Sequence, residues 1–282
     1  MPALYTHLRF GREVAKTLPD LYTKAIERFP EAFALGTQGP DILFYHKPLK
    51  SNDIRKRGTF LHTWSGEKFF LEQGVKLLES AQDGEVEKLL ENNGAFAAYI
   101  CGFLCHFTLD TLCHPYIDGN SNEAVSHGKI ESEFDKATLR LDGMPTRGYN
   151  TATPIVNKNG VKEAVAKTLD VEEKAVVRSI KTMRKINKMF SHKGEWYHRF
   201  LHGVLKLVNM EKKFGDMFLH KEDDPLCVET NEALLVRYQD AIPQASALIQ
   251  EYFENLRVWV DEKRTANNLF RYNFSGIIHT EE

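Results

Sequence analysis

The sequence has few cysteines and little net charge, and each shortage excludes a class of protein. Four cysteines in 282 residues, three of them between positions 101 and 113, do not suit a disulfide framework, so reduced thiols are predicted. The formal net charge of -2 gives the whole molecule no attraction for nucleic acid or for an anionic membrane. Any contact with a polyanion must therefore be local.

Signals for export and for membrane insertion are also missing. The start MPALYTHLRFG lacks the basic beginning and the long apolar run of a signal peptide, so with reduced thiols we expect a cytoplasmic protein. The apolar run 94–117 is long enough to cross a bilayer. However, it contains Asp110, and a carboxylate at the bilayer centre costs roughly 2.5 to 3.5 kcal/mol. A buried helix is predicted instead, with no transmembrane segment.

Strand-like alternation and internal repeats are hard to find, whereas helical periodicity covers most of the chain. We therefore predict an all-α protein with a single domain over 1–282, in which the C-terminal helices pack around the N-terminal ones. The Gly-, Pro- and Asn-rich stretch 142–160 is predicted to be a loop. Asp170 followed by Glu173 resembles a capping box that opens a helix. The expected helices are at about 12–28 with a break at Pro19, 62–80, 83–92, 94–113, 123–141, 161–168, 171–190, 195–213 and 230–262.

Polar side chains recur at intervals of four inside the most apolar segment. The stretch HFTLDTLCHP places His106, Asp110 and His114 on one face of a helix. The stretch SHGKIE repeats the interval with His127 and Glu131 at the start of the next helix. Two polar ridges that could face each other are therefore predicted.

Three further residues upstream complete the set of candidates. They are Asp41, which follows Gly39 and Pro40 in GTQGPDILF, His62 in FLHTWSG, and His7 near the start of the chain. If all eight converge in an apolar interior, the three carboxylates need cations, because unpaired buried charge is too costly. Imidazole nitrogen and carboxylate oxygen suit Zn²⁺ in a catalytic site, with Fe or Mn as open alternatives. The predicted ligands are His7, Asp41, His62, His106, Asp110, His114, His127 and Glu131.

These motifs, in this order, resemble the zinc-dependent phospholipase C family, whose helical fold is shared with S1/P1-type nucleases. The resemblance rests on THLRFG, GTQGPD, His62, AYICGFLCHFTLDTLCHP and SHGKIE, and it covers the first half of the chain. It implies that Asp41 also orients or deprotonates the attacking water. It implies three metal positions, which would be held by Asp41, His62, His106 and Asp110, by His114, His127 and Glu131, and by His7 with a bridging Asp110.

The sequence departs from the family pattern in two respects. The family completes its third zinc site with a mature N-terminal tryptophan, and this chain has none, so two or three zinc ions per chain are expected. Ile42 and Thr59 occupy positions where the family's choline pocket would have aromatic residues. Specificity for phosphatidylcholine is therefore not predicted.

The leading hypothesis is a metal-dependent phosphoric ester hydrolase. Clustered cations can clamp a phosphate and lower the pKa of a bridging water, so a metal-bridging hydroxide is the expected nucleophile. The expected partner is a small phosphoester or a phospholipid headgroup.

Two other functions stay open from the sequence. A nuclease could use the five basic residues of KPLKSNDIRKR, 47–57, although a solvated loop is the favoured interpretation and nucleic acid is the less favoured partner. A helical metal-binding protein without hydrolytic activity, such as a di-iron protein, would need two Glu-x-x-His motifs. Only EWYH, Glu195 to His198, is present, and we interpret it as part of an ordinary amphipathic helix.

Overall fold

Helices form nearly all of the regular structure. The structure is a computed structural model that describes residues 4–81, 84–219 and 222–278. In these residues the only β-type pairing is an isolated bridge between Tyr272 and Ile278, so the all-α prediction is confirmed. The helices are α1 Leu4–Ala15, α2 Asp20–Arg28, α3 Pro30–Gly36, α4 Asp53–Thr63, α5 Gly66–Leu78, α6 Val86–Asn93, α7 Ala95–Asn120, α8 His127–Leu141, α9 Val161–Leu169, α10 Glu173–Phe190, α11 Glu195–Leu207, α12 Glu211–Phe214 and α13 Val228–Glu262. Short 3-10 helices are η1 Gly39–Tyr45, η2 Gly215–Met217, η3 Pro225–Cys227 and η4 Asn268–Arg271.

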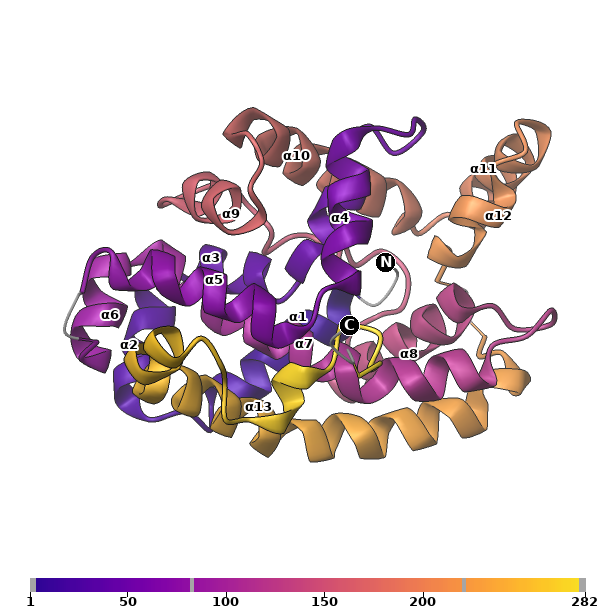
Figure 1. The fold of residues 1–282 in the computed structure, drawn as a ribbon. Coiled ribbons are helices and arrows are strands. Elements are labelled where there is room, and N and C mark those ends of the chain that lie inside the picture. The colour runs from indigo at the N-terminus through magenta and orange to yellow at the C-terminus, as the bar shows by residue number, and fades with distance from the viewer. Residues whose placement is uncertain (1–3, 82–83, 220–221, 279–282) are drawn as a thin grey trace.

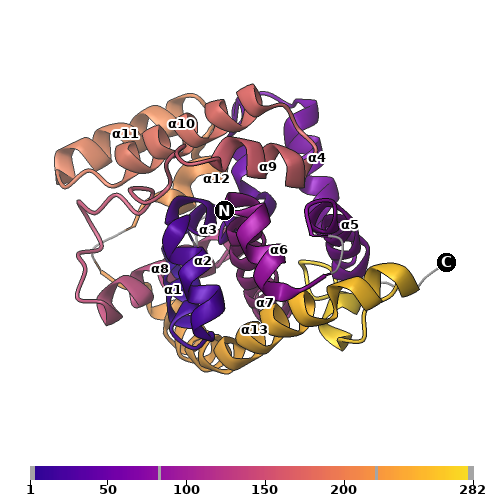
Figure 2. The same ribbon diagram turned by 90° about the vertical axis from the view of Figure 1, so that its left-hand side faces the viewer.

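Helix α7 is the central element of the fold. Most of its residues are apolar and buried, and α1, α3, α8, α9 and α13 all pack against it (Figures 1 and 2). By length and composition this helix could cross a membrane, but 94% of its most apolar window is buried inside the structure. That burial is typical of a core helix.

Two glycines bring α3 and α7 into backbone contact. A Cβ atom added at Gly36 would lie 2.2 Å from the Tyr99 carbonyl oxygen, and one added at Gly102 would lie 2.2 Å from the Phe33 carbonyl oxygen. Larger side chains would therefore force the helices apart. Because η1 follows α3 directly, this contact places η1 beside the polar face of α7.

Several helix boundaries differ from the expectations. Helix α1 begins at Leu4 rather than near residue 12, although the break at Pro19 is confirmed. Helix α7 continues through Pro115 to Asn120, beyond the expected end at 113. Pro115 leaves the Thr111 carbonyl without its helical hydrogen bond, and Gly276 packs directly against that oxygen.

Two helices were not predicted, and one cap was misassigned. The missed helices are α3, which has only seven residues, and α4, which has a charged first turn and is capped by Asn52 through the Arg55 amide. Asp170 does not open α10; it ends α9 in a left-handed conformation. The loop predicted at 142–160 is confirmed, with no helix between α8 and α9 in that described stretch.

The hydrophobic core joins both halves of the chain. One cluster of buried residues extends from Leu4 to Phe274, and α13 packs against α1, α5, α7 and α8. The four cysteines are free and buried, as expected of reduced thiols. A second, smaller cluster holds α11 and α12, which project from the helical body (Figure 1). The single-domain assignment stays a prediction.

Candidate metal centre

The structure brings all eight predicted ligands together from five elements. Helix α7 supplies three of them, α8 supplies two, and α1, η1 and α4 supply one each. They form three groups, and within each group one ligand atom from each residue lies within 4.8 Å of the others. The groups are His7, His106 and Asp110; Asp41, His62 and His106; and His114, His127 and Glu131.

Asp110 belongs to the first group and also faces His114 of the third. Its Oδ2 atom is 3.0 Å from Nε2 of His106, and its Oδ1 atom is 3.2 Å from Nε2 of His7 and 3.6 Å from Nε2 of His114. One carboxylate thus faces three imidazoles from two helices. This is the geometry that a bridging ligand requires.

Four of the five candidate-ligand histidines are oriented in the same way. In each, Nδ1 lies 2.7 to 3.2 Å from an oxygen that can only accept a hydrogen bond, so Nδ1 carries the proton and donates it. The acceptors are the Gly58 carbonyl for His62, the Thr37 carbonyl for His106, the Phe274 carbonyl for His114 and the Asp118 carboxylate for His127. In the neutral ring, Nε2 is consequently left with a lone pair.

Those lone pairs point at carboxylates. Nε2 of His62 lies 3.1 Å from Oδ1 of Asp41, and Nε2 of His127 lies 3.4 Å from Oε1 of Glu131. Two electron-rich atoms at such distances repel each other unless a proton or a metal cation lies between them. Ligating histidines in metalloproteins have this arrangement, with the second nitrogen held by a carbonyl or carboxylate. The donor set of imidazole and carboxylate fits zinc.

His7 differs from the other four histidines. Its Nε2 atom faces Asp110, and its ring lies 4.5 Å from the His106 ring, measured between centroids. Its Nδ1 atom is buried and has no hydrogen-bond partner in the described part of the chain. The His7 ring therefore lacks the hydrogen bond at Nδ1 that orients the other four rings.

Burial and the neighbouring histidines shift the pKa of Asp110 in opposite directions. Burial alone would raise the pKa of this carboxyl, but the charges of His106, His114 and His7 hold the pKa well below its usual range. Burial lowers the pKa of His106, which favours the neutral ring that can ligate. Burial opposes protonation of His114 too, yet Asp110 and Glu131 raise its pKa to about 9. A cation that binds at His114 must therefore displace a proton.

A glycine in η1 makes room for His106. Gly39 has a φ of +48°, which favours glycine, and a Cβ atom added there would lie 2.1 Å from Cδ2 of the His106 ring. A side chain at position 39 would push the imidazole away from Asp41, two residues further on. The glycine of the Gly-Pro-Asp sequence is thus explained by the close approach of η1 to His106 on α7.

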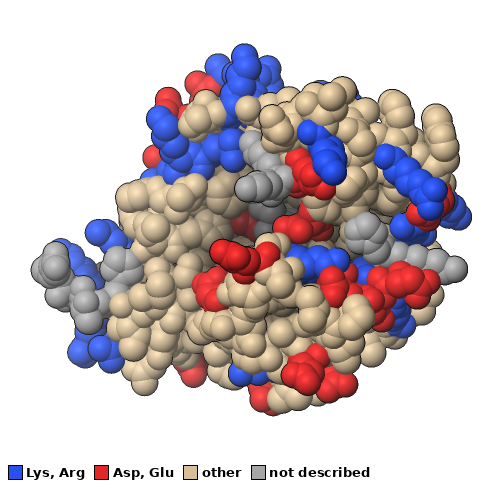
Figure 3. Space-filling view, turned by 90° about the vertical axis from the view of Figure 1, so that its right-hand side faces the viewer, with Lys and Arg blue, Asp and Glu red and all other residues tan. Residues whose placement is uncertain are grey.

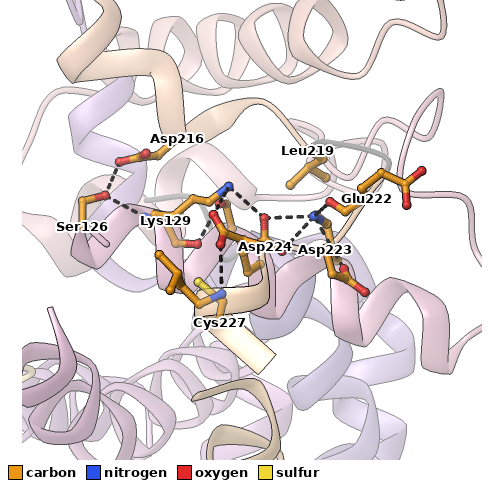
Figure 4. Close-up of polar contacts among 12 residues, drawn as sticks. Ser126, Lys129, Asp216, Leu219, Glu222, Asp223, Asp224 and Cys227 are labelled. Carbon is orange, nitrogen blue, oxygen red and sulfur yellow. Dashed lines mark hydrogen bonds and ion pairs between the residues drawn. The ribbon is translucent and has the colours of Figure 1, made fainter. Parts of the chain in front are cut away.

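A buried ion pair fixes the helix that carries His127 and Glu131. Nζ of Lys136 and the Glu133 carboxylate are 2.8 Å apart, and both side chains are almost fully buried. Lys129, one turn earlier, also binds Glu133 and reaches Asp224 (Figure 4). The backbone amide of Asp224 and the carbonyl of Glu222 complete the network, so α8 is tied to the segment before η3.

The N-terminus of α8 is fixed as well. Ser126 caps the helix through the Lys129 amide, and its hydroxyl donates a hydrogen bond of 2.7 Å to Asp216 (Figure 4). His127 is the first residue after this cap, and its ring is held by Asp118 from the last turn of α7. The Ser126 cap thus fixes the backbone at His127, and Asp118 fixes its ring.

The centre is close to the molecular surface. A pocket is lined by His7, Asp110, His114 and Glu131 together with apolar side chains. The His127 side chain is 37% exposed, so the third group reaches solvent. The space-filling view in Figure 3 shows acidic side chains around a hollow in one face of the molecule.

Sequence reasoning missed the outer partners of the histidines. Three are backbone carbonyls, at Thr37, Gly58 and Phe274, for which the residue type carries no signal. Asp118 did have a signal, because it continues the interval of four from His106 through His114.

Two other motifs do not contribute to the centre. His198 binds the His192 carbonyl, whereas Glu195 pairs with Arg147, so the EWYH motif forms no joint metal site among the described residues. The solvated-loop interpretation of 47–57 is wrong from residue 53 onward, where α4 begins.

We expect Asp118→Ala to weaken metal binding without unfolding the protein. The partly exposed carboxylate fixes the His127 ring, and loss of such a partner typically costs 10–100-fold in metal affinity. Titration of chelated protein with zinc, with the metal content followed directly, would measure the change. The control is Asp240→Ala, an exposed aspartate on α13; equal zinc affinities for the two variants would show that Asp118 has no such role.

Comparison with known proteins agrees with this geometry. The sequence profile of the family described as zinc dependent phospholipase C matches residues 6–181, which include all eight candidate ligands. No curated protein matches the chain, and no solved structure matches it either. The profile covers more than half of the 282 residues, and on that basis the chain belongs to the zinc dependent phospholipase C family.

Proposed function

We propose that the protein is a zinc-dependent phosphoric ester hydrolase of the phospholipase C type, with two or three zinc ions per chain. The observation that carries the proposal is the common orientation of four histidines, each with Nδ1 donating to a fixed acceptor and Nε2 facing a carboxylate. Family membership supports the same chemistry.

Each group of side chains has a place in this proposal. Asp41, His62 and His106 would hold one ion, and His114, His127 and Glu131 would hold another; Asp110 would link them, and His7 would contribute a further ligand. Bound zinc would activate water and neutralise phosphate charge. The chain's own contribution is to hold three carboxylates ionised in a largely buried site and to fix the rings that surround them.

Asp41 is the proposed catalytic residue. Burial opposes its ionisation, but the surrounding positive charge, to which His62 and His106 contribute, holds the pKa of this carboxyl well below its usual value. A carboxylate with a low pKa accepts a hydrogen bond from water readily but takes its proton poorly. We therefore assign Asp41 the task of orienting the attacking water in addition to ligation.

The basic segment 47–57 supports the nuclease alternative poorly. Arg57 lies over the Phe60 and Trp64 rings and donates to the Leu169 carbonyl, and Lys56 pairs with Asp53. These side chains already have partners within the chain. A phosphoester of a small molecule or of a phospholipid headgroup is the proposed substrate class, and the cytoplasmic location stays a prediction.

Metal analysis and activity assays test the function together. We expect two or three zinc equivalents per chain by plasma mass spectrometry, loss of phosphoester hydrolysis on chelation, and recovery when zinc is restored. Phospholipid, nitrophenyl phosphodiester and single-stranded DNA substrates should be compared in parallel. A protein that folds normally but takes up no metal would contradict the proposal, and preferential cleavage of DNA would favour the nuclease.

For Asp41→Asn we expect kcat/KM to fall by about 10²- to 10⁴-fold, because the variant cannot position water through a carboxylate and holds its metal less tightly. Zinc content and kinetics measured on the same preparation would separate the two effects. Full activity with full metal content would refute the role of Asp41.

A further inference from the structure

Helix α11 has two different faces. Its inner face, with His198, Leu201 and Leu205, packs on the second hydrophobic cluster. Its outer face carries apolar side chains that nothing in the described part of the chain covers. We call this outer set the α11 stripe; it consists of Trp196, Phe200, Val204, Leu207 and Val208.

The side chains of the α11 stripe are large and apolar, yet most of their surface is exposed to solvent. Trp196 is 77% exposed, Phe200 is 57% exposed and Leu207 is 84% exposed, and the rings of Trp196 and Phe200 stack with centroids 5.8 Å apart. Residues spaced by four and seven lie along one side of a helix, so these side chains form a continuous band. Contiguous exposed apolar surface of this kind marks an interaction site.

The surroundings of the stripe are strongly basic. Residues 178–206 contain eight lysines and arginines but only one acidic residue, in a chain whose net charge is -2. On α10, the exposed side chains of Lys181, Lys185 and Lys188 form no ion pair with any described residue. On α11 itself, Arg199 and Lys206 border the stripe, and both are exposed.

The C-terminal end of α10 packs against α11, because Phe190 and Leu205 belong to one hydrophobic cluster, with Met189 packed against it. The two helices lie side by side in Figure 2. Lys185 and Lys188, which neighbour these packed residues on α10, therefore lie near the helix that carries the α11 stripe.

We propose that the α11 stripe docks on an anionic phospholipid surface, with Trp196, Phe200 and Leu207 inserted among the lipids and the basic residues of α10 and α11 against the headgroups. Interfacial helices combine these same features, an apolar face with Trp, Phe and Leu and a border of Lys and Arg. A second copy of the chain is a poorer occupant, because a symmetric pair would bring two basic regions together.

This inference rests on the proposed function in one respect, since an enzyme that cleaves phospholipids must reach them in a bilayer. Docking itself needs no metal and no turnover. Binding can therefore be measured on the chelated protein, and hydrolysis of a water-soluble phosphodiester can be measured without vesicles. The two claims can fail separately.

The test is co-sedimentation of the chelated protein with vesicles of phosphatidylcholine that contain about 30% phosphatidylserine. We expect binding that weakens as salt is added, together with a blue shift of tryptophan emission that is lost in Trp196→Phe. The double variant Trp196→Ala, Phe200→Ala should lose at least about tenfold in affinity. Lys185→Glu with Lys188→Glu should lose about as much.

The matched control is Val236→Ala with Val258→Ala, two comparably exposed residues of α13, which should bind like the wild type. All variants should hydrolyse the water-soluble substrate at the wild-type rate. Wild-type binding by the Trp196 and Phe200 double variant would overturn the proposal. So would a dimer in sedimentation that this variant converts to a monomer, because the stripe would then contact a second copy.

Discussion

Lys136→Met is expected to lower the free energy of unfolding by about 3–5 kcal/mol. Lys136 and Glu133 are both almost fully buried, and their charges compensate each other. Removal of the lysine leaves Glu133 with Lys129 as its remaining cationic partner and leaves the Glu222 carbonyl without its donor. Breaking a buried pair from one side is far more costly than losing a surface pair, because the buried charge that stays behind, here Glu133, is only partly compensated by Lys129.

Urea denaturation of the chelated protein would measure this effect free of any metal contribution. Lys16→Met is the matched control, because it removes an exposed pair with Glu13 and should change stability by less than about 1 kcal/mol. The double variant Glu133→Leu, Lys136→Met should recover much of the loss, since no charge is left unpaired. If Lys136→Met denatured at the wild-type urea concentration, the network would not be stabilising α8.

For Asp110→Asn, we expect metal content to fall and kcat/KM to decrease on the order of a thousandfold, equivalent to about 4 kcal/mol. The substitution keeps the volume of the side chain but removes its negative charge. Asp110 faces three histidines that belong to different ligand groups, so the loss should reach more than one metal. Plasma mass spectrometry and steady-state kinetics on one preparation would measure both quantities.

Asp135→Asn is the control for neutralising a buried carboxyl in the same region. Burial raises the pKa of Asp135 to about 7, although Thr6 and Tyr5 donate hydrogen bonds that oppose this shift. The asparagine oxygen can keep both hydrogen bonds from Thr6, which reach a single oxygen atom in the wild type. We expect this variant to retain its metal. Full metal content in Asp110→Asn would contradict the bridging role.

The fold class and the convergence of the eight candidate ligands were both accessible from the sequence, for physical reasons that apply to particular residues. His106, Asp110 and His114 share a face because helical geometry fixes the interval of four, whatever the rest of the fold does. The central position of α7 follows from its mostly apolar sequence, which leaves few residues suited to a solvent-facing side. Local rules were sufficient for these features.

Other features depend on tertiary contacts that local rules do not describe. Helix α3 is short and is held against α7 by backbone contact at Gly36 and Gly102. Its own sequence does not predict this contact. The His114 ring is held by the Phe274 carbonyl, 160 residues away in the chain, and a carbonyl is present at every position. The buried pair of Lys136 and Glu133 could not be distinguished from a surface pair without knowing which side of α8 faces the segment before η3.

The ligand groups differ in how far apart their members lie along the chain. His114 and Glu131 belong to the hairpin of α7 and α8 and are 17 residues apart, whereas Asp41 and His106 are 65 residues apart. Closing the shorter loop costs less chain entropy, by about 1 kcal/mol. During folding, the hairpin group can form before η1 has docked on α7. An ion bound there first would stabilise a partly folded chain. The other groups would form only when α1, η1 and α4 pack against α7 and bring in His7, Asp41 and His62.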